Sequence, residues 1–363
     1  MSKSSSFKSL CLLLLLTVCF VSLLSSAATK DNGKQAMFEG APKTADGRFT
    51  NTESGLSHGS IAVRLPFFMR RVASSLVGRS GAPERVSNDG QFLRENALHS
   101  KPTVTWIGHA TMLIQMEHLT FLTDPIWSKR PSPISFLGPN RFVKPGLAIE
   151  DLPSIDFVVI SHNHYDHLDI PTLRTLAKRD ANTKFYVPLG NGPLLRKNGI
   201  NNVEELDWGQ SVSHAGATVH CLPTQHWSKR KLNDTNKALW SAWAVTGQER
   251  RFYFAGDTGY FPGFEQVGER LGPFDLAAVP IGAYEPSAMM RDSHMNPEEA
   301  LQAAIDLKAR RAVAMHYGTF NLSDESLTEP PKRFKAAALT AEQNNTFLKD
   351  NAWLMQIGET RQF

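Results

Sequence analysis

The chain has 363 residues, of which 41% are hydrophobic and 20% are charged, and its formal net charge is +4. This is an ordinary globular composition, and it permits one large domain or two modest ones. Because the net charge is small, strong binding to polyanions is not expected, and nucleic acid is not a predicted partner.

The first 28 residues have the pattern of a secretory signal peptide. Lys3 and Lys8 precede an apolar segment from Leu10 to Leu24, which small residues follow. The pattern predicts export to the periplasm or cell envelope. The apolar segment is shorter than the roughly 20 residues of a membrane-spanning helix, so an uncleaved membrane anchor is the alternative. Removal of this segment would leave Cys221 without a partner for an internal disulfide.

Residues 29–101 are predicted to form an N-terminal arm, which is polar and shows no strand alternation. Within it, residues 61–72 mix large apolar side chains with arginines. One interpretation is that this segment packs its aromatic side chains onto the main domain. The alternative is a segment that lies on a membrane surface. Pro66 argues against a continuous helix there. Peripheral membrane contact and the contacts of a homodimer would both depend on this arm.

After Pro102, short apolar runs separated by turn residues predict a series of strands. These strands span residues 104–107, 112–116, 119–123, 157–160, 184–187, 218–222, 242–245, 252–254, 276–280 and 312–315. A proline in the first turn predicts a helix over residues 171–178. Asn296, followed by acidic residues, predicts the N-cap of a second helix that runs to about residue 309. The order of elements favours a layered α/β domain over residues 102–363.

The stretch SHNHYDHLD, residues 161–169, places four candidate metal ligands within six residues, directly after a predicted buried strand. His162 and His164 are two residues apart, so at the end of a strand they project to the same side and can share one metal. Asp166 and His167 follow where the chain must turn, and they can reach a second metal. Two metals about 3.5–4 Å apart can hold a hydroxide between them and clamp both oxygens of a displacement reaction.

Three further candidate ligands each follow a predicted strand, namely His226, Asp257 and His316. Gly256 and Gly259 permit tight turns on either side of Asp257, which would aim its carboxylate inward. Because this carboxylate has two oxygens, it is suited to bridge two metals. Nitrogen and carboxylate ligands make zinc the expected metal, although iron or manganese would also fit.

These residues resemble the HxHxDH signature of the metallo-β-lactamase-fold hydrolases. Longer phrases between about residues 103 and 331 resemble the N-acylphosphatidylethanolamine-hydrolysing phospholipase D family: TDPIWSKRPSPISFLGPNRF, PTQHWSKR, FAGDTGY, GPFDLAAVPIGAYEP and HYGTF. The resemblance implies an αββα four-layer sandwich that holds two zinc ions. It implies one metal bound by His162, His164, His226 and Asp257, and the other bound by Asp166, His167, Asp257 and His316.

The same resemblance implies a zinc-dependent phosphodiester hydrolase. Its substrate would be the phospholipid N-acylphosphatidylethanolamine, and its products N-acylethanolamine and phosphatidic acid, formed by attack of a metal-bridging hydroxide on phosphorus. Asp166 and Asp257 are then the catalytic carboxylates, and Tyr165 and His294 contact the substrate. His109 also fits the family pattern; because seven ligands already fill both metals, it is predicted either to orient the ligands without binding a metal or to be structural. The alternative is a related hydrolase of a soluble phosphodiester, a lactone or a β-lactam, since one fold hosts many chemistries. A non-catalytic metal-binding protein is the third hypothesis.

Overall fold

The computed structural model describes residues 38–53, 56, 59–74, 81–134 and 138–363, all of which belong to one compact unit. The predicted signal peptide, residues 1–28, lies outside the described residues, as do residues 29–37 of the predicted arm. Of the helices in the described ranges, none combines the length and the apolar character that crossing a membrane requires.

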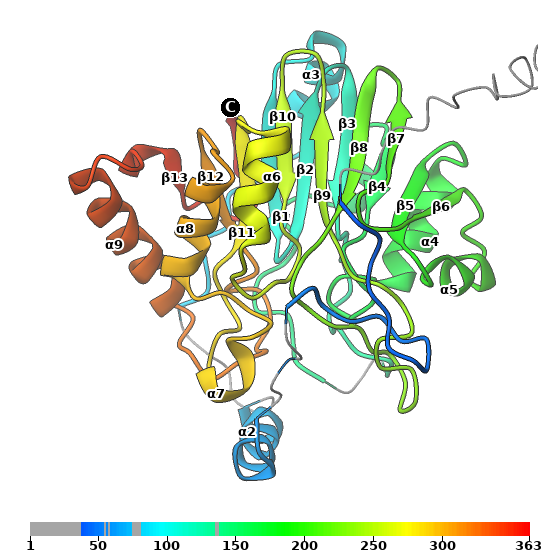
Figure 1. Cartoon of the computed structure of the whole chain (residues 1–363). Helices are drawn as coiled ribbons and strands as arrows, with labels where there is room; N and C mark the ends of the chain where they lie inside the picture. The colour runs from blue at the N-terminus through cyan, green and yellow to red at the C-terminus, as the bar shows by residue number, and fades with distance from the viewer. Residues whose placement is uncertain (1–37, 54–55, 57–58, 75–80, 135–137) are drawn as a thin grey trace, which may run out of the picture. The chain divides into compact units, whose positions relative to one another are not determined.

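Two mixed seven-stranded sheets form the centre of the described chain (Figure 1). The first sheet has the strand order β14-β1-β2-β3-β4-β5-β6. Its strands β1 to β3 pair antiparallel, whereas β3 to β6 pair parallel. The bounds are β1 (Thr103–Gly108), β2 (Thr111–Met116), β3 (Leu119–Thr123), β4 (Phe157–Val159), β5 (Lys184–Pro188), β6 (Val203–Leu206) and β14 (Thr360–Gln362).

The second sheet has the order β13-β12-β11-β10-β9-β8-β7. Here β7 to β10 pair antiparallel, and β10 to β13 pair parallel. The bounds are β7 (Ser211–His214), β8 (Ala217–Leu222), β9 (Ala242–Thr246), β10 (Arg251–Phe254), β11 (Leu276–Pro280), β12 (Ala312–Met315) and β13 (Ala352–Trp353).

Strand β4 shows why the predicted apolar runs form buried strands. Its side chains alternate between the two faces of the sheet. Phe157 points to the core between the sheets, where it stacks on Phe121 at 4.6 Å, and Phe121 meets Phe252 of the second sheet at 5.8 Å. Val158 points the other way and joins Leu173 in the core beneath the outer helices. Because both faces are covered, the strand is apolar throughout.

Helices cover the outer faces of both sheets, which confirms the predicted αββα order (Figure 1). The first sheet is covered by α3 (Gln91–His99), α4 (Ile170–Arg179) and α5 (Gly192–Lys197), and the second by α6 (Gly263–Leu271), α8 (Pro297–Asp306) and α9 (Glu329–Gln343). The two predicted helices correspond to α4 and α8. Shorter elements complete the chain: η1 (Ile149–Asp151), α7 (Ser287–Met290) and η2 (Lys349–Asn351).

Helix α2 (Ile61–Ser74) runs through Pro66, so the expectation that this proline prevents a continuous helix is wrong. A proline removes one backbone donor, and contacts with other parts of the chain can offset that loss. Arg71 supplies such contacts, because its guanidinium pairs with Asp324 at 2.6 Å and also donates to the Ser323 carbonyl. The helix buries Phe67 and leaves other apolar side chains exposed, namely Ile61, Leu65, Phe68 and Met69.

Candidate metal centre

Four loops that follow the ends of β4, β8, β10 and β12 carry the predicted ligands. In the loop after β4, the backbone amides of His167 and Leu168 donate to the His164 carbonyl, which closes a tight turn. Just before this turn, His162 Nε2 lies 2.8 Å from His164 Nδ1. The two side chains therefore converge, as their spacing predicts.

His226 joins this first pair from the loop after β8. Its Nε2 lies 3.3 Å from His164 Nδ1, while its Nδ1 lies 3.0 Å from the Ser293 carbonyl. Because a carbonyl only accepts, Nδ1 must carry the hydrogen and Nε2 keeps its lone pair. Burial lowers the pKa of His226 and of His162 well below the ordinary value, which favours the neutral imidazole that binds metals.

His167 and His316 form a second group with Asp166. Their Nε2 atoms are 3.1 Å apart, and Asp166 Oδ2 lies 3.3 Å from the first and 3.5 Å from the second. His109 lies behind this carboxylate, with Nε2 at 2.9 Å from the same oxygen. His109 thus contacts Asp166, and its ring centroid lies 4.2 Å from that of His316 with the two rings tilted.

Asp257 stands between the two groups. Its Oδ2 lies 3.1 Å from His167 Nε2 and 3.9 Å from the Nε2 atoms of His162 and His226, and its Oδ1 lies 3.0 Å from His316 Nε2. Gly256 has the positive φ of 61° that the predicted turn requires. Burial alone would raise the pKa of Asp257, but His167 and His316 hold this pKa well below its usual range.

The donor set fits a metal pair. Four ligands about 2.05 Å from a tetrahedral metal are about 3.3 Å from one another, close to the 2.8–3.3 Å between the ring nitrogens here. Asp257 Oδ1 is buried and makes no hydrogen bond with any described residue, although it lies 3.0 Å from His316 Nε2. A cation bound by both atoms would explain why this oxygen lies so close to a ring nitrogen without a hydrogen bond to it.

Asp124 is a site residue that the sequence analysis missed. Its Oδ2 accepts a hydrogen bond from His167 Nδ1 at 2.6 Å, and its Oδ1 accepts one from the Ser161 amide at 2.6 Å. Burial raises the pKa of Asp124. One signal was present in the sequence, since Asp124 directly follows a buried strand, as the predicted ligands do. The contacts of Asp124 orient the His167 ring and leave His167 Nε2 available for a metal.

Tyr165 and His294, the two predicted substrate contacts, both lie on a cavity of about 510 Å³ above the clustered donors. The Tyr165 hydroxyl donates to the Arg230 carbonyl at 2.9 Å, and the Arg230 guanidinium lies 4.0 Å from its ring centroid. His294 Nδ1 lies 3.9 Å from Asp257 Oδ2. The cavity floor consists of His164, Asp166, Asp257 and His316.

Apolar side chains form the walls of this cavity, and none of them was predicted. They come from separate parts of the chain: Phe67, Phe68, Trp227, Met289, Met290 and Leu322. Two cations, Arg64 and Lys229, also line it. The arrangement is a polar floor of candidate metal ligands beneath a largely apolar chamber, which suits a ligand with a charged group and a long apolar part.

Comparisons with known proteins identify the family. A model described as a beta-lactamase superfamily domain matches residues 120–317, a range that includes all seven predicted ligands. The N-acyl-phosphatidylethanolamine-hydrolyzing phospholipase D 1 of Caenorhabditis elegans is 43% identical over 267 residues, which is 70% of this chain and 74% of that protein. The mitochondrial N-acyl-phosphatidylethanolamine-hydrolyzing phospholipase D of Saccharomyces cerevisiae is 35% identical over 270 residues, which is 71% of this chain and 55% of that protein.

Among solved structures, an isothiocyanate hydrolase from Delia radicum gut bacteria matches with a TM-score of 0.57. It is 22% identical and covers 72% of this chain and 99% of its own. At this identity the likeness concerns the fold alone, and it agrees with the two-sheet sandwich described above.

The localisation predicted from residues 1–28 is contradicted. The name of the Saccharomyces cerevisiae relative places that protein in the mitochondrion. A basic start and an apolar run are features of composition, and in this chain they do not establish export. The prediction of export to the periplasm or cell envelope is therefore not retained.

The family model, the relatives and the fold agree with the convergent histidines and carboxylates. The chain belongs to the metallo-β-lactamase-fold hydrolase superfamily and is related, within it, to the N-acyl-phosphatidylethanolamine-hydrolysing phospholipases D.

Proposed function

We propose that this metallo-hydrolase is a zinc-dependent phospholipase D that cleaves N-acylphosphatidylethanolamine into N-acylethanolamine and phosphatidic acid. Two relatives that are named as N-acyl-phosphatidylethanolamine-hydrolyzing phospholipases D support this substrate. The cavity supports it as well, because its apolar walls suit acyl chains and its floor gathers metal ligands.

The observation that carries the proposal is the position of Asp257 between two groups of imidazoles. One zinc ion would be held by His162, His164, His226 and Asp257, and the other by Asp166, His167, Asp257 and His316. When bound, such a pair supplies an acidified water for attack on phosphorus and positive charge for the phosphate oxygens.

The remaining residues of the cavity would bind and orient the lipid. Burial lowers the pKa of His294 to about 4, so its neutral ring can offer one N–H to a headgroup oxygen. Tyr165 is held by its bond to the Arg230 carbonyl, which fixes its ring at the cavity wall. Phe67 and Phe68 would contact the acyl chains and exclude water from the floor.

A phospholipid must reach this cavity from a lipid surface, so we also propose peripheral membrane contact through α2. The same helix that supplies Phe67 and Phe68 to the cavity exposes Ile61, Leu65 and Met69. Apolar side chains beside arginines are typical of helices that lie at a lipid interface.

The test is hydrolysis of N-acylphosphatidylethanolamine in mixed micelles, with N-acylethanolamine measured by mass spectrometry. Asp257→Asn should reduce turnover at least about 100-fold, the upper end of the effect seen for groups that only orient ligands. Asp350→Asn, which alters an exposed carboxylate outside the cavity, should leave turnover unchanged. Elemental analysis of the active protein should find two zinc ions per chain.

Two outcomes would contradict the proposal. If the metal-loaded protein leaves the lipid intact but hydrolyses a soluble phosphodiester, a lactone or a β-lactam, the substrate class is wrong and the alternative function holds. If iron or manganese supports turnover and zinc does not, the metal assignment is wrong.

A further inference from the structure

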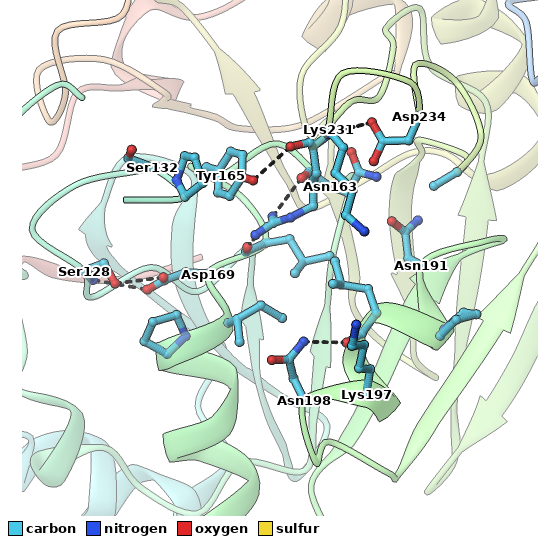
Figure 2. A pocket seen from close by; sticks show the side chains of 18 of the residues that line it. Ser128, Ser132, Asn163, Tyr165, Asp169, Asn191, Lys197, Asn198, Lys231 and Asp234 are labelled. Atoms are coloured by element: carbon cyan, nitrogen blue, oxygen red, sulfur yellow. Dashed lines mark hydrogen bonds between the residues drawn. The ribbon is translucent and has the colours of Figure 1, made fainter. Parts of the chain in front are cut away.

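A second cavity, of about 810 Å³, is shown in Figure 2, and it shares the lining residue Tyr165 with the metal cavity. Its walls come from the loops that follow β3, β4 and β5, from the first turn of α4, from α5 and the residue after it, and from residues 230–238. It therefore lies outside the carboxyl ends of parallel strands, where open α/β sheets commonly bind ligands. Among its described lining residues, Tyr165 also lines the metal cavity, and none is a proposed metal ligand.

Positive charge dominates this second cavity. Two carboxylates and six cations line it, and the cations are Lys129, Arg130, Lys197, Arg230, Lys231 and Lys237. Both carboxylates are already engaged. Asp169 accepts hydrogen bonds from the hydroxyls of Ser128 at 2.8 Å and Thr172 at 2.6 Å. Asp234 Oδ1 accepts from the amides of Arg230 at 3.0 Å and Lys231 at 2.7 Å. Within the described chain, none of the four lysines forms an ion pair.

Arg230 is the fixed member of this set. Its Nη1 donates to the carbonyls of Asn163 at 2.9 Å and Leu168 at 2.8 Å, and its guanidinium stacks on the Tyr165 ring. These two backbone carbonyls engage only Nη1. Nε and Nη2 carry two parallel N–H groups on another edge of the guanidinium, the geometry that binds two phosphate oxygens at once. Because the guanidinium is already ordered, little side-chain entropy is lost on binding.

We propose that the second cavity binds a phosphate monoester, carried by a soluble small molecule or by the headgroup of phosphatidic acid. A phosphate monoester carries about −1.5 to −2 charges at neutral pH, so it matches several cations better than a singly charged diester does. Figure 2 shows Lys197 of α5 and Lys231 of the loop on opposite sides of the cavity, so both can approach one anion. Leu168, Ile170 and Leu194 supply apolar surface for the rest of the ligand.

The experiment measures binding by isothermal titration calorimetry with the metal-loaded full chain at low salt. Three probes are used: inorganic phosphate, glycerol 3-phosphate and a short-chain phosphatidic acid below its micelle concentration. Because a metal centre can also bind phosphate, the Asp257→Asn variant provides the background in which the second cavity is tested alone.

In that background, the double substitution Lys197→Glu and Lys231→Glu should weaken binding of the monoesters at least tenfold. The matched pair Lys332→Glu and Lys335→Glu, on α9 and outside both cavities, should leave binding unchanged. Affinity should also fall as salt is raised, since the exposed lysines are screened. Circular dichroism would confirm that the variants are folded.

The proposal is overturned if Asp257→Asn alone abolishes phosphate binding, if the Lys197 and Lys231 substitutions leave it unchanged, or if no probe binds. Tighter binding of phosphatidic acid than of glycerol 3-phosphate supports the lipid source, and the reverse order supports a soluble ligand. None of these outcomes depends on lipid hydrolysis, so failure here and failure of the proposed phospholipase activity are distinguishable.

Discussion

Three side chains at the metal centre stand on backbone with positive φ: His109 at 56°, Asp124 at 35° and His316 at 62°. Non-glycine residues rarely adopt this conformation, which costs of order 1–3 kcal/mol each and persists only where surrounding contacts impose it. The contacts are present here, because the His109 carbonyl accepts hydrogen bonds from the Trp106 indole and from the His316 amide. Strained backbone gathered at one place is typical of a functional site.

Asp124 gives the first prediction at the scale of the residue. In Asp124→Asn, one of the two carboxylate oxygens becomes a donor, so the side chain can no longer accept from both His167 Nδ1 and the Ser161 amide. We expect the affinity for zinc to fall about 10- to 100-fold, the usual effect of losing a group that orients a ligand. Competition with a chelator of known affinity measures this, with Asp350→Asn as the control. Equal affinities in the two variants would contradict the orienting role.

At the scale of the element, the Asp324 carboxylate is one of the groups that hold α2 over the metal cavity. Asp324 pairs with Arg71 at 2.6 Å and with Arg70 at 2.5 Å. In Asp324→Asn both ion pairs weaken, so we expect faster amide hydrogen exchange in residues 61–71 while the strands of both sheets keep their protection. Hydrogen exchange with mass spectrometry provides the measurement. If exchange in α2 is unchanged, other contacts hold the helix.

Helix α8 begins with the capping box that its sequence indicates. The Asn296 side chain accepts from the Glu299 amide at 2.9 Å, and the Glu299 carboxylate accepts from the Asn296 amide at 3.0 Å. Asn296→Ala should lower the free energy of unfolding by about 1 kcal/mol. Denaturant unfolding would detect this. Asn344→Ala is the matched control, because the Asn344 side chain makes no hydrogen bond with the described residues; a similar loss in both variants would contradict the capping role.

Some of the elements that the sequence analysis did not predict, such as α6, β13 and β14, lack local signals. Helix α6 begins after Pro262, which has no capping side chain, and it contains Gly268, where a Cβ would lie 2.1 Å from the Asp306 carbonyl oxygen of α8. Glycine is therefore required by packing at a position where it disfavours a helix locally. Strands β13 and β14 have two and three residues, and they form only by pairing with strands that lie far away in the sequence.

At the scale of the whole molecule, the predicted ligands could be identified because each follows a strand whose apolar run is strong. The convergence of His162, His226, Asp257 and His316 then follows from the fold, since strand ends on two packed sheets meet at one edge. The cavity walls could not be identified in this way. Phe67, Met289 and Leu322 come from segments with no shared pattern, and only the tertiary structure brings them together.

The centre also joins the two sheets, because His162, His164, Asp166 and His167 follow a strand of the first sheet, whereas His226, Asp257 and His316 follow strands of the second. Bound metal should therefore stabilise the fold. At a free zinc concentration a thousand times the Kd, linkage adds about 4 kcal/mol to the free energy of unfolding.

Chelation should remove this stabilisation and leave buried carboxylates and imidazoles without their shared cation. We expect a lower midpoint of unfolding in denaturant, which should recover when zinc is restored. Asp257→Asn is the informative comparison. This substitution should lower the affinity for zinc, and it should therefore also reduce the change in midpoint that the chelator causes. A midpoint that is the same with and without chelator, in protein shown by elemental analysis to have lost its metal, would mean that packing of the apolar faces alone holds the two sheets together.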